Sequence, residues 1–219
     1  MSAMSAKGRG PEVSGGDFES PRGLTLDIRC LTLHGRPLLG PLSLHVPPGT
    51  VHTLMGPSGS GKSSLLAAVC GTLDPALQLQ GRIRLDGIAI DEQPTEARRV
   101  GLLFQDDLLF AHMTVRENLL FAVPPGPRAG REATVRRALA DLELPDLGDA
   151  DPATLSGGQR ARVALMRALL AQPRALLLDE PFSRLDSALR ERMRRYVFDT
   201  IRQRGIPALL VTHDAADIA

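Results

Sequence analysis

Cysteine is scarce in this chain, which contains only Cys30 and Cys70 among its 219 residues. The two lie far apart and show neither a CxxC pair nor a Cys/His spacing, so the sequence gives no sign of a disulfide framework or a zinc site. We expect two buried, reduced thiols, as in a cytosolic protein. A chain of this length buries roughly 70 % of its unfolded surface and needs no disulfide or metal to hold a core.

Long apolar runs are absent as well. No run approaches the roughly 20 residues that a membrane-spanning helix requires. Residues 1–22 are rich in glycine, serine and proline and lack the apolar stretch of a signal peptide. We expect 1–22 to be a disordered tail. If the protein works at a membrane, another chain must hold it there.

Lysine is equally rare, and the net charge is close to zero. Lysine occurs only at Lys7 and Lys62, and arginine supplies the rest of the 26 basic residues. The formal net charge of +1 argues neither for nor against a polyanionic partner. The apolar fraction of 43 % and the charged fraction of 23 % are typical of a soluble globular protein.

Strand and helix patterns alternate along the chain. Stretches broken by glycine and proline predict antiparallel strands over 24–46, and a hairpin is expected to begin at Arg82. Apolar runs predict buried strands at 51–55, 100–104, 175–178 and 206–211. Apolar periodicity and capping signals predict helices at 62–70, 114–123, 131–144, 157–171 and 187–204. This order predicts an α/β fold with a mostly parallel sheet, an antiparallel β subdomain and an inserted helical lobe at about 106–160, all within one domain over 23–219.

The strongest local signal is a glycine-rich segment that fits the pattern G-x-x-x-x-G-K-[ST] between a predicted strand and a predicted helix. Its glycines let successive N–H groups point at phosphate oxygens, at the positive end of the helix dipole. Lys62 suits the β- and γ-phosphates, and Ser63 offers a hydroxyl to Mg²⁺. The sequence therefore predicts a P-loop NTPase fold. The candidate nucleotide-binding residues are Gly56, Pro57, Ser58, Gly59, Ser60, Gly61, Lys62, Ser63 and Ser64.

Two acids follow the buried strand predicted at 175–178. Ligands bind at the carboxyl ends of strands in open α/β sheets, where these acids lie. Asp179 is the candidate to hold the Mg²⁺ shell, and Glu180 is the candidate general base that orients or deprotonates the attacking water. Alone, an apolar strand that ends in Asp-Glu is common and often only solvated. Beside the phosphate loop, the catalytic interpretation is favoured.

A serine-headed helix start at 155–159 resembles the signature of ABC (ATP-binding cassette) ATPases. The resemblance extends over 24–219. It implies that the serine and the following N–H groups form a second anion site, which faces the γ-phosphate of an ATP molecule bound to a partner subunit. The signature residues are Leu155, Ser156, Gly157, Gly158 and Gln159.

Three further positions match this family. Gln105 resembles the Q-loop glutamine, which contacts Mg²⁺ and the attacking water. His213 resembles the H-loop histidine, which contacts the γ-phosphate. Asp186 ends a Ser-Arg-Leu-Asp segment that resembles the D-loop, usually Ser-Ala-Leu-Asp, so Arg184 is a departure at a tolerant position. A second departure is the lack of an aromatic residue over 31–39 to stack on adenine, where His34 is the nearest candidate.

The resemblance implies the partners and the location. Two copies are expected to sandwich two ATP molecules with Mg²⁺ as a homodimer at the cytoplasmic face of the bacterial inner membrane. Integral-membrane permease subunits are expected to contact 105–123, and a periplasmic solute-binding protein to act indirectly. The residues at 159–170 and 179–183 resemble importers of the thiamine, ferric-iron and polyamine group, and 151–186 is similar to the ATPase of an uncharacterised bacterial importer of that group.

Three other interpretations stay open at this point. A soluble ABC ATPase that acts on ribosomes or DNA usually has tandem cassettes or long coiled-coil insertions, which this sequence lacks, so no nucleic-acid partner is expected. A small-molecule kinase with a phosphate loop leaves the residues at 155–159 unexplained. A subunit that binds ATP without hydrolysis conflicts with the presence of Glu180 and His213.

Overall fold

The computed structural model describes residues 22–57 and 59–218. Ser58, Ala219 and all of the expected tail except Arg22 lie outside these residues, so the disorder of 1–22 stays a prediction. The mostly parallel sheet, the antiparallel sheet and the helices agree with the predicted fold class. Within the described part of the chain, no helix is both long and apolar enough to span a bilayer.

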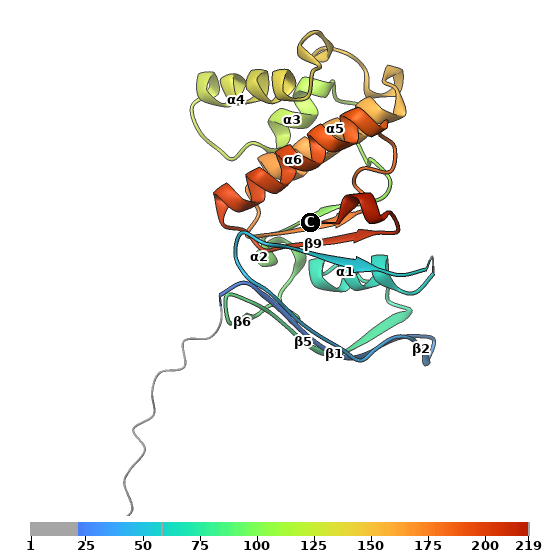
Figure 1. Ribbon diagram of the computed structural model, residues 1–219. Coiled ribbons are helices and arrows are strands. Elements are labelled where there is room, and N and C mark those ends of the chain that lie inside the picture. Colours follow the sequence, from blue (N-terminus) through green and yellow to red (C-terminus); the bar gives the residue numbers. More distant parts are fainter. Residues whose placement is uncertain (1–21, 58, 219) are drawn as a thin grey trace, which may run out of the picture.

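An antiparallel sheet occupies the lower part of Figure 1. Its long central strand pairs with one neighbour along its whole length and with two short strands on its other side. Gly81 lies against this central strand with φ +154°, where a Cβ atom would come within 2.3 Å of the Asp27 carbonyl oxygen. The strands are β1 (Leu24–Leu33), β2 (Arg36–Leu39), β3 (Leu42–Val46), β5 (Leu77–Leu85) and β6 (Ile88–Ala89).

A parallel sheet with strand order β4-β9-β8-β7 lies at the centre of the molecule. Its strands are β4 (Val51–Met55), β7 (Val100–Leu103), β8 (Ala175–Asp179) and β9 (Ala208–Thr212). Every residue of β8 and β9 is buried, as expected for strands covered on both faces. Alternate residues of each strand enter two different hydrophobic cores.

The two cores lie on opposite faces of the parallel sheet. One core includes α1 and the antiparallel sheet, and receives Leu177 from β8. The other includes the remaining long helices, and receives Leu178. The helices are α1 (Lys62–Cys70), α2 (Thr95–Arg98), α3 (Val115–Ala122), α4 (Arg128–Asp141), α5 (Gly157–Leu170) and α6 (Ser187–Arg204). Figure 1 shows α3, α4 and α5 above the parallel sheet, with α1 between the two sheets.

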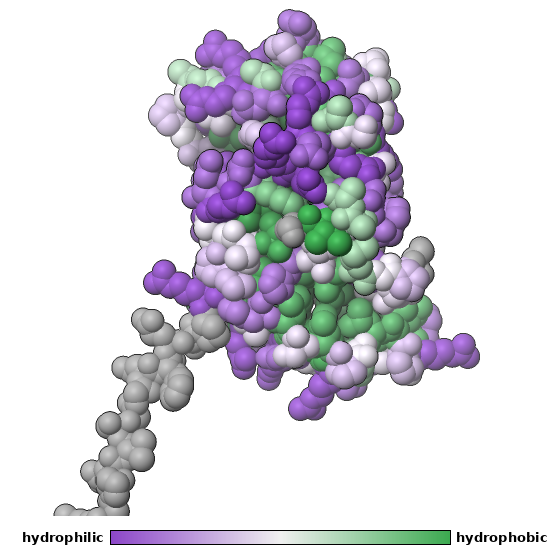
Figure 2. Space-filling model, viewed as in Figure 1, coloured by the Kyte–Doolittle hydropathy of each residue, from purple (hydrophilic) through white to green (hydrophobic). Residues whose placement is uncertain are grey.

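The lobe expected at about 106–160 contains α3, α4 and the first turn of α5. Its apolar side chains belong to the same core as those of α5 and α6. Figure 2 shows that the helical upper part of this face is mostly polar, whereas apolar side chains gather lower down, over the sheets. The division into a tail and one domain with a lobe remains a prediction.

Several local predictions were wrong. The helix expected at 131–144 begins at Arg128 and ends at Asp141. Its first turn follows Pro127 and accommodates Gly130 at a cost of roughly 1 kcal/mol relative to alanine. The hairpin strand begins at Leu77 rather than at Arg82, because it pairs with β1 along its full length. Both cysteines are free, but only Cys70 is buried and Cys30 is half-buried.

Candidate nucleotide-binding site

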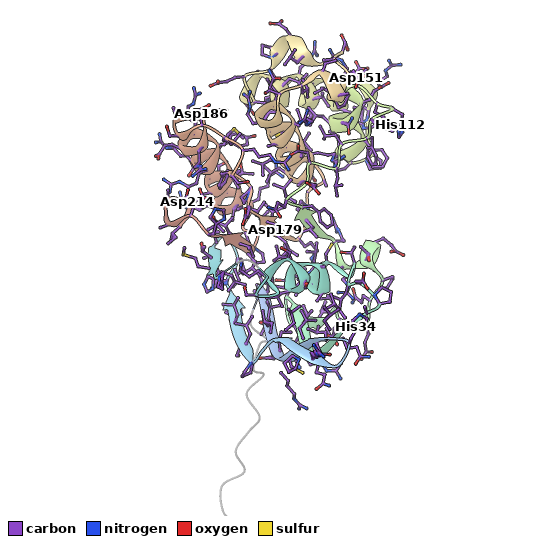
Figure 3. All side chains as sticks on the ribbon, turned by 90° about the vertical axis from the view of Figure 1, so that its right-hand side faces the viewer. His34, His112, Asp151, Asp179, Asp186 and Asp214 are labelled. Carbon is purple, nitrogen blue, oxygen red and sulfur yellow. The ribbon has the colours of Figure 1, made fainter. Side chains whose placement is uncertain are left out.

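The carboxyl edge of the parallel sheet collects residues from distant parts of the sequence. The glycine-rich loop follows β4, Gln105 follows β7, Glu180 follows β8 and His213 follows β9. Figure 3 looks onto this edge and shows Asp179 near the middle of the molecule, above α1. A pocket of about 250 Å³ opens here, lined by Leu38, Gly59, Gly61, Lys62, Ser63, Ser64, Gln105, Asp179, Glu180 and Val211.

The glycine-rich loop turns tightly into α1. Gly59 and Gly61 adopt φ of +79° and +86°, a left-handed conformation that glycine tolerates. The Lys62 ammonium group donates hydrogen bonds to the carbonyl oxygens of Gly56, at 2.8 Å, and Pro57, at 2.6 Å. Among the described residues, no side chain caps the start of α1, and its first turn holds no acidic residue, so its N–H groups are available to an anion. Ser58 lies outside the described residues.

Asp179 ends β8 beside the start of α1. The residue is 7 % exposed. Burial raises the pKa of its carboxyl group and the charge of Glu180 adds to this, while a hydrogen bond from Ser63 and the charge of Lys62 oppose it. Asp179 therefore lies close to a hydroxyl, a second carboxyl group and an ammonium group.

Glu180 and His213 are in direct contact. His213 Nδ1 lies 2.8 Å from Glu180 Oε1. The Glu180 backbone has φ of +49°, which is unusual for a residue with a side chain, and its N–H donates to the Val211 carbonyl oxygen at 2.9 Å. The Glu180 side chain is 20 % exposed and the His213 side chain is 67 % exposed. The acid is thus held at the pocket, while the histidine remains open to solvent.

The segment at 155–159 forms a complete capping box at the start of α5. Ser156 Oγ accepts a hydrogen bond from Gln159 N at 3.2 Å, and Gln159 Oε1 accepts one from Ser156 N at 2.8 Å. Leu155 is buried. Gly158 packs closely, since a Cβ atom there would lie 3.3 Å from the Arg184 carbonyl oxygen. None of the described residues at 155–159 lines the pocket, so one chain does not bring this segment to its own phosphate loop.

The remaining predicted positions differ in their contacts. Gln105 is exposed and lines the pocket with Glu180. Asp186 caps α6, because its Oδ1 accepts a hydrogen bond from Leu189 N at 3.0 Å. In Figure 3 it lies at the start of α6, away from Asp179.

Two residues that line or flank the site were not predicted from the sequence. Leu38 lines the pocket, whereas His34, the expected adenine neighbour, is exposed at the turn after β1 and does not line it. Leu38 lies in β2, two strands before the phosphate loop, so no short sequence pattern marks it. Arg184, at a position that the sequence predicted to tolerate different residues, forms ion pairs with Asp106 and Asp107. No local sequence pattern predicts these ion pairs.

Among the residues described, no group of three or more His, Cys, Asp and Glu side chains could hold a metal ion. A Mg²⁺ ion here would be held by one or two protein oxygen atoms together with phosphate oxygens, as is usual for this ion. Asp179 and the Ser63 hydroxyl, which hydrogen-bonds to it, supply such oxygen atoms beside Lys62. The residues present therefore fit a nucleotide-bound Mg²⁺.

Comparisons with known proteins agree with this geometry. The chain matches the family model described as ABC transporter over residues 39–183. It is 50 % identical over 182 residues to the uncharacterised ABC transporter ATP-binding protein YnjD of Escherichia coli K12, covering 83 % of this chain and 84 % of YnjD. It is 46 % identical over 166 residues to the thiamine import ATP-binding protein ThiQ of Cereibacter sphaeroides, and the match covers 75 % of this chain and 71 % of ThiQ.

Longer relatives and solved structures extend the comparison. The sulfate/thiosulfate import ATP-binding protein CysA of Escherichia coli K12 is 40 % identical over 183 residues, which are 81 % of this chain but only 49 % of CysA. A dimeric structure of MJ0796, described as a bacterial ABC transporter cassette, has a TM-score of 0.77 at 27 % identity and covers 89 % of this chain and 90 % of its own. A post-hydrolysis dimer of the same cassette with ADP and phosphate also has a TM-score of 0.77, at 28 % identity.

Proposed function

Because this chain belongs to the ABC transporter family, we propose that it binds and hydrolyses ATP to energise the import of a small solute across the bacterial inner membrane. The observation that carries the proposal is the pocket where Lys62, Asp179 and Glu180 converge with Gln105 at one edge of the sheet. Each of these residue types suits one part of a triphosphate reaction.

The phosphate loop grips the nucleotide. The backbone N–H groups at the start of α1 bind phosphate oxygens, and Lys62 exchanges its carbonyl partners for the β- and γ-phosphates. Ser63, Asp179 and Gln105 would hold Mg²⁺, which would neutralise charge on the phosphates. Leu38 offers an apolar contact next to Gly61, in place of an aromatic ring on the base.

Glu180 is the general base in this account. Its carboxylate orients the attacking water and accepts its proton, as a carboxylate next to a phosphate-binding loop can do. His213 holds that carboxylate through the 2.8 Å contact and reaches the γ-phosphate from the same edge. Gln105 also lines the pocket, and it would contact the same water.

A second copy of the chain completes the site. Ser156, Gly157 and Gly158 do not reach the phosphate loop of their own chain, and the similar MJ0796 cassette is a dimer. In a head-to-tail homodimer the start of α5 on one copy faces the γ-phosphate held by the other. Asp186 caps α6 close to this surface. Loss of the γ-phosphate removes a contact shared by both copies, so hydrolysis loosens the dimer.

An apolar groove beside Gln105 is the proposed permease contact. Three exposed apolar side chains lie in it, with exposed fractions of 41 % for Phe104, 55 % for Leu108 and 64 % for Phe121. The groove encloses about 350 Å³ between β7, α3 and α5. A short helix of a membrane-embedded permease fits a groove of this kind. The chain would thereby sit peripherally on the cytoplasmic face of the membrane.

The names of the relatives bear on the solute. CysA is described as a sulfate/thiosulfate import protein, ThiQ as a thiamine import protein, and PotG of Escherichia coli K12 as a putrescine transport protein. All three are small solutes, which supports import of a solute of that size by the complex that this chain energises. Selection of the solute falls to the permease and to a periplasmic solute-binding protein. No nucleic-acid partner is part of this proposal.

The test of the reaction is phosphate release. The purified chain is expected to release inorganic phosphate in step with ADP formation, and only when Mg²⁺ is present. Transfer of the phosphate to an added small-molecule acceptor would contradict the proposal and favour a kinase.

The groove has a separate test. Phe121→Asp should leave the basal hydrolysis of the isolated chain unchanged. In liposomes that also contain the cognate permease subunits, it should abolish the stimulation of hydrolysis by the permease. Ile88→Asp is the matched control, since Ile88 is 55 % exposed on the antiparallel sheet, outside the groove. Equal stimulation of both variants would overturn the assignment of the groove.

A further inference from the structure

Asp107 lies at the centre of a small charged cluster next to the nucleotide pocket. Its side chain is only 11 % exposed, and Arg184 Nη1 lies 2.8 Å from its Oδ2. Arg160 Nε lies 3.5 Å from the same oxygen atom. The second terminal nitrogen of Arg184 lies 3.2 Å from Asp106 Oδ1. One guanidinium group therefore bridges two neighbouring carboxylates.

The cluster joins three segments that are far apart in the sequence. Asp106 and Asp107 directly follow Gln105, Arg160 lies in the first turn of α5, and Arg184 lies between β8 and α6. The backbone of Arg184 contributes as well, because its carbonyl oxygen packs against Gly158 at the start of α5. Arg184 thus contacts both the segment after Gln105 and the helix start at 155–159.

The cluster also borders the gap between the two pocket residues Gln105 and Glu180. A small crevice with room for about 10 Å³ lies between them, and Asp107 and Arg184 form part of its wall. The ion pairs of Asp107 with Arg184 hold the segment that follows Gln105 against the segment that follows Glu180. A lysine at position 184 could not reproduce this bridge, because only the planar fork of arginine presents separate nitrogen atoms to two carboxylates.

The exposed pair of the cluster contributes little to stability. The side chains of Arg184 and Asp106 are 39 % and 83 % exposed, and water screens an ion pair with this exposure. The cluster as a whole acts on geometry: it fixes the segment that carries Gln105 against the segment that follows Glu180. Hydrolysis depends on such positions, since misplacement by about 1 Å can cost about a hundredfold in rate.

We infer that Arg184 is a positioning residue for ATP hydrolysis, which acts by holding Gln105 at its working distance from Glu180 through Asp107. The inference rests on the proposed function of this pocket. The Arg184 side chain forms no hydrogen bond or ion pair with the described residues of the phosphate loop, and only its backbone carbonyl oxygen packs on Gly158. ATP affinity therefore does not depend on the side chain. Its loss lowers the rate of the chemical step and leaves the binding step intact.

The test compares Arg184→Ala with Arg184→Lys, Asp107→Asn and the Arg184→Ala/Asp107→Asn double variant. We expect Arg184→Ala to lower kcat for ATP about tenfold with KM unchanged, and Arg184→Lys to restore little of it. The double variant should be no slower than Arg184→Ala, because both changes break the same Arg184–Asp107 ion pair. The matched control is Arg174→Ala, which removes an ion pair of similar exposure with Asp86, at 2.6 Å on another part of the molecule.

Two outcomes overturn the inference. One is a kcat for Arg184→Ala equal to that of Arg174→Ala. The other is a double variant in which the separate reductions of kcat by Arg184→Ala and Asp107→Asn add up. A lower thermal midpoint for Arg184→Ala than for Arg174→Ala, with an unchanged kcat, would show a structural role only. If the parental chain itself does not hydrolyse ATP, the proposed function fails instead, so the two failures are distinguishable.

Discussion

His213 Nδ1 and Glu180 Oε1 are 2.8 Å apart, although 33 positions separate the two residues in the sequence. The contact exists because β8 and β9 are adjacent parallel strands and each delivers its next residue to the same edge. Glu180 additionally adopts a left-handed backbone conformation, with φ of +49°. This strained geometry at the pocket supports a functional role for the pair.

Lys62→Ala should weaken nucleotide binding. The ammonium group is the only charged donor of the phosphate loop, and hydrogen bonds to charged groups contribute about 1.5–3 kcal/mol, which corresponds to roughly a tenfold to hundredfold loss of ATP affinity. Titration with a fluorescent ATP analogue measures this, and thermal melting shows whether the variant is folded. Unchanged affinity in a folded variant would rule out the phosphate-cradle assignment.

Ser156→Ala should affect the dimer more than the fold. The change removes the cap of α5 and costs about 1 kcal/mol of stability, measured by urea unfolding. Thr114→Ala is a matched control, because Thr114 forms the same capping box at α3 with the same 3.2 Å hydrogen bond to the third N–H group. Only Ser156→Ala should lose ATP-dependent dimerisation in sedimentation. Equal dimerisation by both variants would disprove the shared site.

Asp86→Asn should destabilise the protein in a pH-dependent way. Burial raises the pKa of Asp86, but hydrogen bonds from Gly23 N and Arg174 and the nearby positive charges outweigh it and hold the pKa below the usual 3.8. The carboxylate therefore stabilises the fold above pH 3.8, and that contribution disappears as the pH falls through the lower folded-state pKa.

We expect Asp86→Asn to cost about 1 kcal/mol at pH 7, a modest value because the side chain is 35 % exposed. Urea unfolding between pH 7 and pH 3 measures how the difference from the parental chain shrinks. Asp199→Asn, which removes an exposed pair within α6, should change stability less. If the loss of unfolding free energy caused by Asp86→Asn grew as the pH fell from 7 to 3, the stabilising role of the Asp86 carboxylate would be contradicted.

The order of elements and most site positions could be predicted from the sequence for physical reasons. Buried parallel strands are continuous apolar runs, and the ligand site lies where such runs end, so Asp179 and His213 could be located from local pattern. The capping boxes at Thr114 and Ser156 are equally local, and the structure contains both. Helix ends at Gly71 and Gly205 follow the same logic, since both residues adopt left-handed conformations.

The features that were missed depend on contacts between distant segments. Leu38 lines the pocket because β2 passes beside Gly61, which no short pattern specifies. The bridge from Arg184 to Asp107 spans 77 positions. The helix α4 begins at Arg128 rather than after Gly130, because packing of Val135, Ala138 and Leu139 offsets a poor helix former near its start. Tertiary packing decided each of these three cases.

The measurement that tests the central claim most directly is the behaviour of Glu180→Gln with ATP and Mg²⁺. We expect the variant to bind ATP with parental affinity, to lose turnover by at least about a hundredfold, and to elute as a stable dimer in size-exclusion chromatography. The parental chain should return to its nucleotide-free elution volume as it consumes ATP. Hydrolysis by Glu180→Gln at the parental rate would contradict the assignment of Glu180 as the base and the account built on it.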